Sequence, residues 1–148
     1  MAAGRSNFAK LADEAGLPHG ERSHWYDSTP AHEAAEWATE LGAGDAFRWA
    51  TYRAYFVHDQ NIGSADVLAA IATDIGLDET DLRAALQGGR YRDRVQAQYE
   101  EARQVGVRAV PTFVAADRYA LEGAHPLENF RKLMATVAEN AANDAGLT

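Results

Sequence analysis

The sequence predicts an α+β fold that is mostly helical, and the change in hydrophobic spacing along the chain carries this prediction. Apolar residues recur three and four positions apart in successive segments as far as Val105, which is typical of amphipathic helices. The pattern then alternates in Thr112 to Ala115 and in Arg118 to Glu122, which predicts a β-hairpin over Ala116-Asp117. An amphipathic segment opening at Pro126 predicts a closing helix.

The N-terminal region predicts two short elements. A helix is expected from Asn7, with one apolar face, and Gly16 with Pro18 ends it. The segment from Arg22 to Asp27 is a candidate short strand.

A helical region follows, and its start signals are explicit. Thr29 is the expected N-cap of the first helix, with Pro30 as the first helical residue. Later helices are expected to open at Asp45, at Ser64, at Asp78 and near Tyr91. At the other end of the chain, the tail from Ala138 to Thr148 is expected to fray.

Charge and hydropathy exclude two classes of partner. The 148 residues carry a formal net charge of −8, and the sequence pI is about 5.0. Nucleic-acid phosphates and anionic membranes both require a basic face, so neither is expected as a partner. No apolar run approaches the roughly 18 residues of a spanning helix. The segment Met1 to Asn7 lacks the apolar core of a signal peptide, so a cytoplasmic location is expected.

The chain contains no cysteine. This excludes disulfides, zinc–thiolate sites and cysteine nucleophiles within these 148 residues. His19, His24 and His32 are spaced five and eight apart, which fits no helical metal pair. We therefore expect neither a metal nor a cofactor, and no catalytic residue is assigned.

Aromatic residues and charges at helical spacing each allow two interpretations. Trp37, Trp49, Tyr52, Tyr55 and Phe56 could line a pocket for a small aromatic ligand, although such residues more often belong to a core. The alternating charges from Arg90 to Arg103 are typical of a solvated helix face.

Several motifs, in a shared order, resemble the DsbA branch of the thioredoxin superfamily, and in particular the FrnE-like group of cytoplasmic dithiol–disulfide isomerases. Val110-Pro111-Thr112-Phe113 resembles the cis-proline loop of that branch, and Gly123-Ala124 with Pro126 resembles the turn into its final helix. The resemblance implies one DsbA-like domain over residues 1–148. Residues 29–105 would form its helical insertion and residues 106–141 the β-β-α half of a thioredoxin-like core.

The resemblance also implies a thiol–disulfide oxidoreductase, and the composition conflicts with that activity. Family members begin with a cysteine-bearing β-α-β unit, and nothing comparable precedes Ser28 here. Whether the chain is an enzyme stays open. The expected function is a redox-silent module that binds a peptide or protein, or serves assembly, with Val110, Pro111 and Thr112 as binding residues. Two alternatives remain: a half-enzyme completed by a separate Cys-x-x-Cys chain, and a glutathione-dependent isomerase or transferase.

An incomplete thioredoxin-like core leaves surfaces to cover. The hairpin would have an open edge with unpaired backbone groups. Four apolar side chains would be exposed to solvent, those of Phe113, Phe130, Leu133 and Val137. A homodimer is therefore the expected assembly, because one patch then serves both partners.

Overall fold

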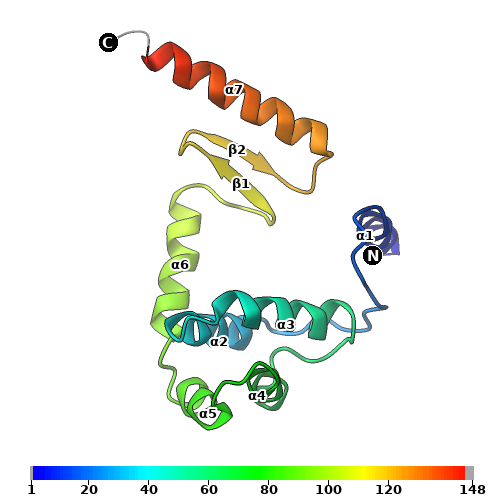
Figure 1. Cartoon of the computed structure of the whole chain (residues 1–148), viewed down its shortest axis with the longest axis vertical. Coiled ribbons are helices and arrows are strands. Elements are labelled where there is room, and N and C mark those ends of the chain that lie inside the picture. Colours follow the sequence, from blue (N-terminus) through cyan, green and yellow to red (C-terminus); the bar gives the residue numbers. More distant parts are fainter. Residues whose placement is uncertain (1, 146–148) are drawn as a thin grey trace. The chain divides into compact units, whose positions relative to one another are not determined.

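The computed structural model describes the chain from Ala2 to Ala145, with side chains from Phe8 to Ala142. It is mostly helical with one small sheet, which confirms the predicted α+β class (Figure 1). The chain forms two compact units, Met1–Gln98 and Tyr99–Thr148. The boundary between them falls within one helix, α6 (Arg92–Gln104).

The first unit is built from helices alone in its described part. These are α1 (Ala2–Glu14), α2 (Thr29–Glu40), α3 (Gly44–Phe56), α4 (Ala65–Asp74), α5 (Glu79–Gln87) and the first half of α6. The start signals explain several of them. Ser64 occupies the N-cap of α4, and the Asp78 carboxylate at the N-cap of α5 accepts the Thr80 N–H at 2.8 Å.

Helix α2 begins one residue earlier than predicted. Ser28 occupies the N-cap position and Thr29 is already helical, so the assignment of Thr29 as the cap is wrong. The capping bond comes from one residue further back: Asp27 Oδ1 accepts the Thr29 N–H at 2.9 Å. The backbone and hydroxyl of Thr29 hold the pKa of Asp27 below its ordinary value.

The core of this unit surrounds α2. Trp37, Phe47, Leu68 and Leu82 are the largest fully buried side chains, and they come from α2, α3, α4 and α5. The rings of Trp37 and Phe47 meet edge to face, with centroids 6.3 Å apart. The expected apolar stripes on these helices therefore converge on one core.

The charged helix around Arg90 to Arg103 is only partly a solvated face. Arg94 lies 2.9 Å from Glu36 and 3.0 Å from Glu40, both on α2. The Tyr91 hydroxyl donates to Glu40 at 2.7 Å. The first half of α6 is thus attached to α2 by ion pairs that helical periodicity alone could not predict.

The strand predicted from Arg22 to Asp27 is wrong, because the structure has no regular element there. A strand requires a neighbour for its backbone, and in the described part of this unit there is no other strand. The Ser23 N–H instead donates to both carboxylate oxygens of Asp59, at 3.1 Å each. The segment is therefore held by the Asp59 side chain and not by a sheet.

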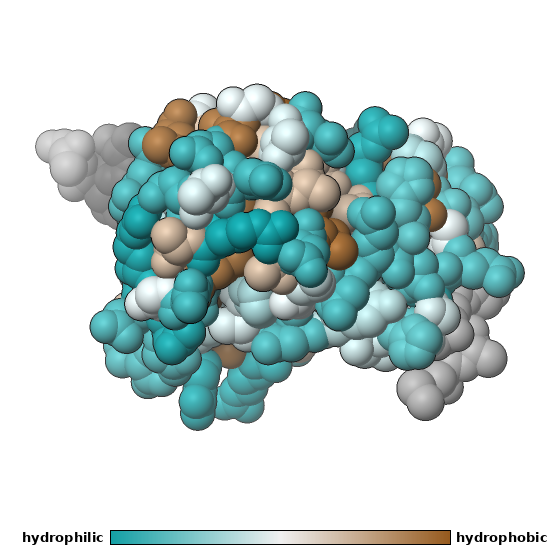
Figure 2. Space-filling model, turned by 90° about the horizontal axis from the view of Figure 1, so that it is seen from below, coloured by the Kyte–Doolittle hydropathy of each residue, from teal (hydrophilic) through white to brown (hydrophobic). Residues whose placement is uncertain are grey.

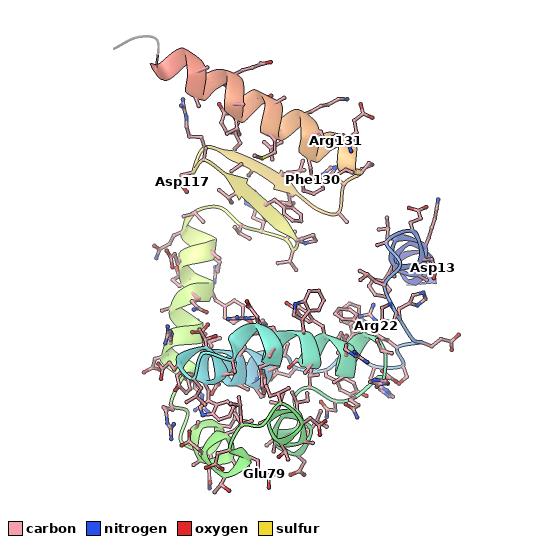
Figure 3. The ribbon with its side chains drawn as sticks, viewed as in Figure 1. Asp13, Arg22, Glu79, Asp117, Phe130 and Arg131 are labelled. Carbon is pink, nitrogen blue, oxygen red and sulfur yellow. The ribbon has the colours of Figure 1, made fainter. Side chains whose placement is uncertain are left out.

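Arg22 anchors the same segment through aromatic rings (Figure 3). Its guanidinium lies 5.1 Å from the ring centroids of Phe8 and Phe56, 5.2 Å from that of Tyr55 and 5.3 Å from that of Trp25. It also donates to the Tyr55 hydroxyl at 3.1 Å. Such cation–π contacts contribute about 0.5–2 kcal/mol each, so the segment is fixed on α3 without β-sheet pairing.

The second unit contains the end of α6, β1 (Thr112–Ala115), β2 (Tyr119–Glu122) and α7 (Leu127–Ala145). The predicted hairpin is confirmed, with Ala116 and Asp117 at its turn in the left-handed region at φ 51° and 52°. Its antiparallel register pairs Thr112 with Glu122, Phe113 with Leu121, Val114 with Ala120 and Ala115 with Tyr119. Helix α7 covers one face of this hairpin (Figure 1).

The expectation that the tail frays from Ala138 is wrong, because α7 continues to Ala145. The added stretch is rich in alanine, which has the highest helix propensity. The Asn140 amide also donates to the Tyr119 hydroxyl at 2.6 Å, so this part of α7 is tied to β2. Residues 146–148 of the predicted tail lie outside the described residues.

Figure 2 shows one face of the molecule as predominantly hydrophilic, with hydrophobic residues interspersed rather than gathered in one broad patch. This agrees with a chain that carries a net charge of −8.

Candidate peptide-binding edge

The loop before β1 holds the three residues that the sequence selects for binding. Val110 is 89% exposed, and the Val110–Pro111 peptide bond is cis. The Thr112 hydroxyl donates to the Ala109 carbonyl at 2.7 Å, a hydrogen bond within the loop itself. Among the described residues, no hydrogen bond engages the Val110 N–H or C=O.

The hydrogen-bond pattern between β1 and β2 determines which backbone groups of β1 point away from β2. The Gly123 N–H donates to the Pro111 carbonyl at 2.7 Å, so these two residues form a hydrogen-bonded pair. Along an antiparallel ladder, such pairs alternate with pairs whose N–H and C=O groups point away from the partner strand. Thr112 and Val114 belong to the second kind. Their backbone groups point to the edge of β1 that has no neighbouring strand in the described chain.

The two faces of the hairpin differ. Phe113 packs edge to face on Phe130 of α7, with ring centroids 4.7 Å apart (Figure 3). Tyr119 lies on the same side of the sheet, bonded to α7. Val114, whose side chain points to the opposite face, is 57% exposed. The helix therefore supports one face of β1, while the other face and the outer edge stay accessible within this unit.

A histidine stabilises the turn that follows β2. His125 Nε2 lies 2.8 Å from the Glu122 carbonyl, and His125 Nδ1 lies 3.1 Å from the Asn129 amide nitrogen. These contacts join the end of β2 to the first turn of α7. They give His125 the role of a turn residue.

The chemistry available at this edge is that of the backbone. The chain has no thiol, and in its described part no three His, Asp or Glu side chains could together hold a metal ion. Open N–H and C=O groups bind an extended polypeptide as an added strand, with side chains of alternate residues giving specificity. Val110, Thr112 and Val114 present such groups in succession.

Sequence reasoning selected Val110, Pro111 and Thr112 but did not find Val114. The period-2 pattern locates a strand without saying which of its residues face the partner, and the Gly123–Pro111 bond supplies that information. The assignment of these residues to binding stays a prediction.

The five aromatic residues that the sequence offered as a possible pocket lie in different environments in the structure. Trp37 belongs to the core, and Tyr55 contacts Arg22. Trp49, Tyr52 and Phe56 line a cavity against α1, which the sequence did not connect with them.

The sequence profile of the DsbA-like thioredoxin domain matches residues 6–135. The chain belongs to this family, as the motif resemblance implied. The helix-rich region followed by strand, strand and helix is the arrangement that the resemblance led us to expect. The division into one domain with an insertion over residues 29–105 and a β-β-α half over residues 106–141 stays a prediction.

Among known proteins, the chain is 34% identical over 128 residues to the uncharacterized protein YwbO of Bacillus subtilis, a match that covers 83% of this chain. It is also similar to the crystal structure of a probable DsbA oxidoreductase from Streptomyces coelicolor, with a TM-score of 0.82 and 30% identity over 93% of this chain. The chain spans about 60% of the length of each of these two proteins.

More distant structures share the fold alone. A putative protein disulfide isomerase from Nitrosomonas europaea has a TM-score of 0.73 at 21% identity, covering 94% of this chain and 74% of that protein. A 2-hydroxychromene-2-carboxylate isomerase has a TM-score of 0.76 at 16% identity, covering 97% of this chain and 68% of that protein.

None of the helices described here has the length and apolar character needed to cross a membrane.

Proposed function

We propose that this chain is a redox-silent binding module of the DsbA-like family. It accepts an extended polypeptide as an added strand along β1, with Val110, Pro111 and Thr112 at the start of the contact. The observation that carries the proposal is the outward direction of the Thr112 and Val114 backbone groups on an edge with no described neighbour. A polypeptide from another molecule would satisfy these groups.

The redox-silent part of the proposal rests on composition. Disulfide exchange begins with attack by a thiolate on a disulfide sulfur, and none of the 148 residues is a cysteine. The oxidoreductase activity named for the Streptomyces coelicolor protein is said of that protein alone. For this chain we expect binding without exchange, and a cytoplasmic location stays a prediction.

A second candidate is a half-enzyme, in which a separate chain bearing a Cys-x-x-Cys β-α-β unit supplies the added strand. The similarity to the Streptomyces coelicolor structure favours it, because the TM-score of 0.82 is reached over only 60% of that protein. It predicts that thiol–disulfide exchange appears only when the cysteine-bearing chain is added. A glutathione-dependent isomerase has weaker support, since the 2-hydroxychromene-2-carboxylate isomerase shares the fold alone.

We also propose that the chain forms a homodimer through the second unit. None of the side chains described between Tyr99 and Ala142 is fully buried. Leu127 and Met134 on α7 are 62% and 58% exposed. Removing apolar surface from water stabilises a protein by roughly 25 cal/mol per Å², and surface that stays exposed does not make this contribution. A two-fold contact between copies of α7 would cover the same patch on both chains.

Proline substitutions on the two edges of the hairpin test the binding proposal. Val114→Pro removes an N–H that points to the β1 edge, and Ala120→Pro removes the equivalent N–H on the β2 edge. Both leave the β1–β2 hydrogen bonds in place, because edge positions tolerate proline when the N–H faces outward. Circular dichroism should show the same helix content for both variants.

The probe is an unfolded protein with blocked cysteines, carrying a fluorescent label and titrated by anisotropy. We expect Val114→Pro to weaken its binding by at least about tenfold, as loss of backbone pairing demands, and Ala120→Pro to bind like the parent chain. Equal binding by all three proteins would contradict the proposal, as would a loss confined to Ala120→Pro.

A further inference from the structure

A cavity of about 460 Å³, separate from the one against α1, lies in the first unit where α2, α4, α5 and α6 come together. Helices α4 and α5 both pack on α2 (Figure 1). The cavity has an apolar wall and three charged side chains: Pro30, Ala65 and Leu86 form the first, and Glu33, Arg83 and Arg92 supply the charges. Cavities of about 300–1,000 Å³ that combine apolar walls with a few polar groups are the usual form of small-molecule sites.

The Glu33 carboxylate is buried at this cavity without a hydrogen bond. Its side chain is only 6% exposed, and its ion pair with Arg92 is long, with Arg92 Nε 3.6 Å from Glu33 Oε1. A hydrogen bond is shorter than this, and no other described residue donates to this carboxylate. Every fully enclosed side-chain nitrogen and oxygen of the described residues has a hydrogen-bond partner. The Glu33 oxygens, which lack one, therefore open onto the cavity, where a ligand can donate to them.

The guanidinium of Arg92 has donors to offer beside this carboxylate. It lies against Gly89, and among the described residues its only polar contact is the long one to Glu33. Arg83 differs, because it already donates to Asp66 at 2.6 Å. The cavity thus presents one unbonded acceptor and one unbonded donor side by side, and their charges cancel.

We propose that this cavity binds a small molecule that carries a primary carboxamide. The amide NH₂ donates to the Glu33 carboxylate, and the amide carbonyl accepts from Arg92. Standard bond lengths put the nitrogen and oxygen of an amide about 2.2 Å apart. Two nearly parallel hydrogen bonds of about 2.9 Å can therefore join them to protein atoms that lie 3.6 Å apart. The apolar part of the ligand lies against Pro30 and Leu86.

The same pair of side chains disfavours the charged relatives of an amide. A ligand carboxylate would place a like charge beside Glu33, and a ligand ammonium would place one beside Arg92. The site lies wholly within the first unit and involves no residue of the β1 edge. It is therefore independent of the proposed peptide binding.

Three ligands that share a ring and differ in the polar group test this requirement. Cyclohexanecarboxamide, cyclohexanecarboxylate and cyclohexylmethylamine are titrated into the full chain by calorimetry. We expect saturable binding of the amide, with the acid and the amine each at least about tenfold weaker, since each loses one charge-assisted hydrogen bond. Absence of saturable amide binding would overturn the proposal. Equal or tighter binding of the acid or of the amine would also overturn it.

Two pairs of variants locate the amide. Glu33→Gln and Arg92→Gln each remove one charged partner, and each should weaken amide binding by about tenfold. Glu36→Gln and Arg94→Gln make the same changes in charge on the same two helices, at positions outside the cavity wall. These two should bind the amide like the parent chain. Equal effects of the variants inside and outside the wall would contradict the site.

A cavity-filling pair keeps the test decisive if a charge variant fails to fold. Ala65→Trp places a large side chain at the cavity wall and should abolish amide binding. Ala70→Trp makes the same change on α4 away from the wall and should leave binding intact. Both alanines are exposed, so both variants are expected to fold, which the thermal midpoint verifies. Amide binding that survives Ala65→Trp would place the ligand elsewhere and refute the proposal.

Discussion

The indole N–H of Trp37 donates to the Asp81 carboxylate at 2.7 Å. The same carboxylate accepts two bonds from Arg90, at 2.9 and 3.1 Å. The Trp37 side chain on α2 is fully buried, so its indole N–H is shielded from water and requires a hydrogen-bond acceptor within the protein. The contact joins α2 to α5, and Arg90 joins both to the start of α6. The Asp81 carboxylate on α5 thus links α2, α5 and the residues that lead into α6.

The first prediction concerns the acid dependence of this contact. Hydrogen bonds from Arg90 and then Trp37 hold the pKa of Asp81 below its ordinary value. A lowered folded-state pKa gives stability that is present above the unfolded value of about 3.9 and is lost as pH falls through the folded value. Asp81→Asn should therefore be less stable than the parent chain at pH 7, and the difference should persist to about pH 5 and shrink below about pH 4.

Urea midpoints across this pH range measure the difference. Asp74→Asn, an exposed substitution of the same kind on α4, serves as the control and should cause no loss of stability at pH 7. A difference between Asp81→Asn and the parent chain that grew as the pH fell would contradict the assignment.

The second prediction compares a buried and an exposed leucine. Leu82 is fully buried and Leu41 is 54% exposed. Leu82→Ala should lower the free energy of unfolding by about 2–5 kcal/mol, because it leaves a cavity in the core. Leu41→Ala should change it by no more than about 0.5 kcal/mol. Chemical denaturation of the two variants decides this, and similar losses in both would argue against the described core.

The third prediction concerns the ion pairs between α2 and α6. Arg94→Gln removes contacts to Glu36 and Glu40, and the half-exposed position limits the expected loss to about 0.5–1 kcal/mol. The loss should decrease in 1 M NaCl, where the Debye length is about 3 Å. Arg103→Gln on the same helix, for which no ion pair is described, should have little effect at either salt concentration. A loss that does not respond to salt would indicate packing instead of charge.

The fourth prediction concerns the proposed homodimer. Light scattering at micromolar concentration should give twice the chain mass of 16.1 kDa. Met134→Glu places a charge on the exposed apolar face of α7 and should shift the mass to that of one chain. Thr136→Glu, which points to another side of the helix, should leave the dimer intact. A single-chain mass for the parent protein at all concentrations would exclude the dimer.

The sequence predicted those elements whose signals are local. Asp78 marks the start of α5 by capping it, and the alternating pattern after Val110 locates the hairpin. The strand from Arg22 to Asp27 failed because its backbone bonds to Asp59, a contact that no local pattern encodes. The fraying of the tail failed because helix propensity and the Asn140–Tyr119 bond together extend α7.

The candidate sites divide in the same way. The loop Val110 to Thr112 is contiguous and could be recognised by its motif. The outward direction of Val114 depends on the cross-strand bond from Gly123, and the cavity beside Glu33 depends on α2, α4, α5 and α6 coming together. Both arise from residues distant in sequence, so neither could be predicted from a single segment.

Amide hydrogen exchange along β1 tests the binding proposal most directly. The Phe113 and Ala115 amides face β2 and should already be protected in the free chain, whereas those of Thr112 and Val114 face the open edge. On addition of the blocked unfolded protein, we predict that Thr112 and Val114 become protected while Phe113 and Ala115 change little. Unchanged exchange at Thr112 and Val114 at saturating probe, or new protection only on β2, would contradict the account.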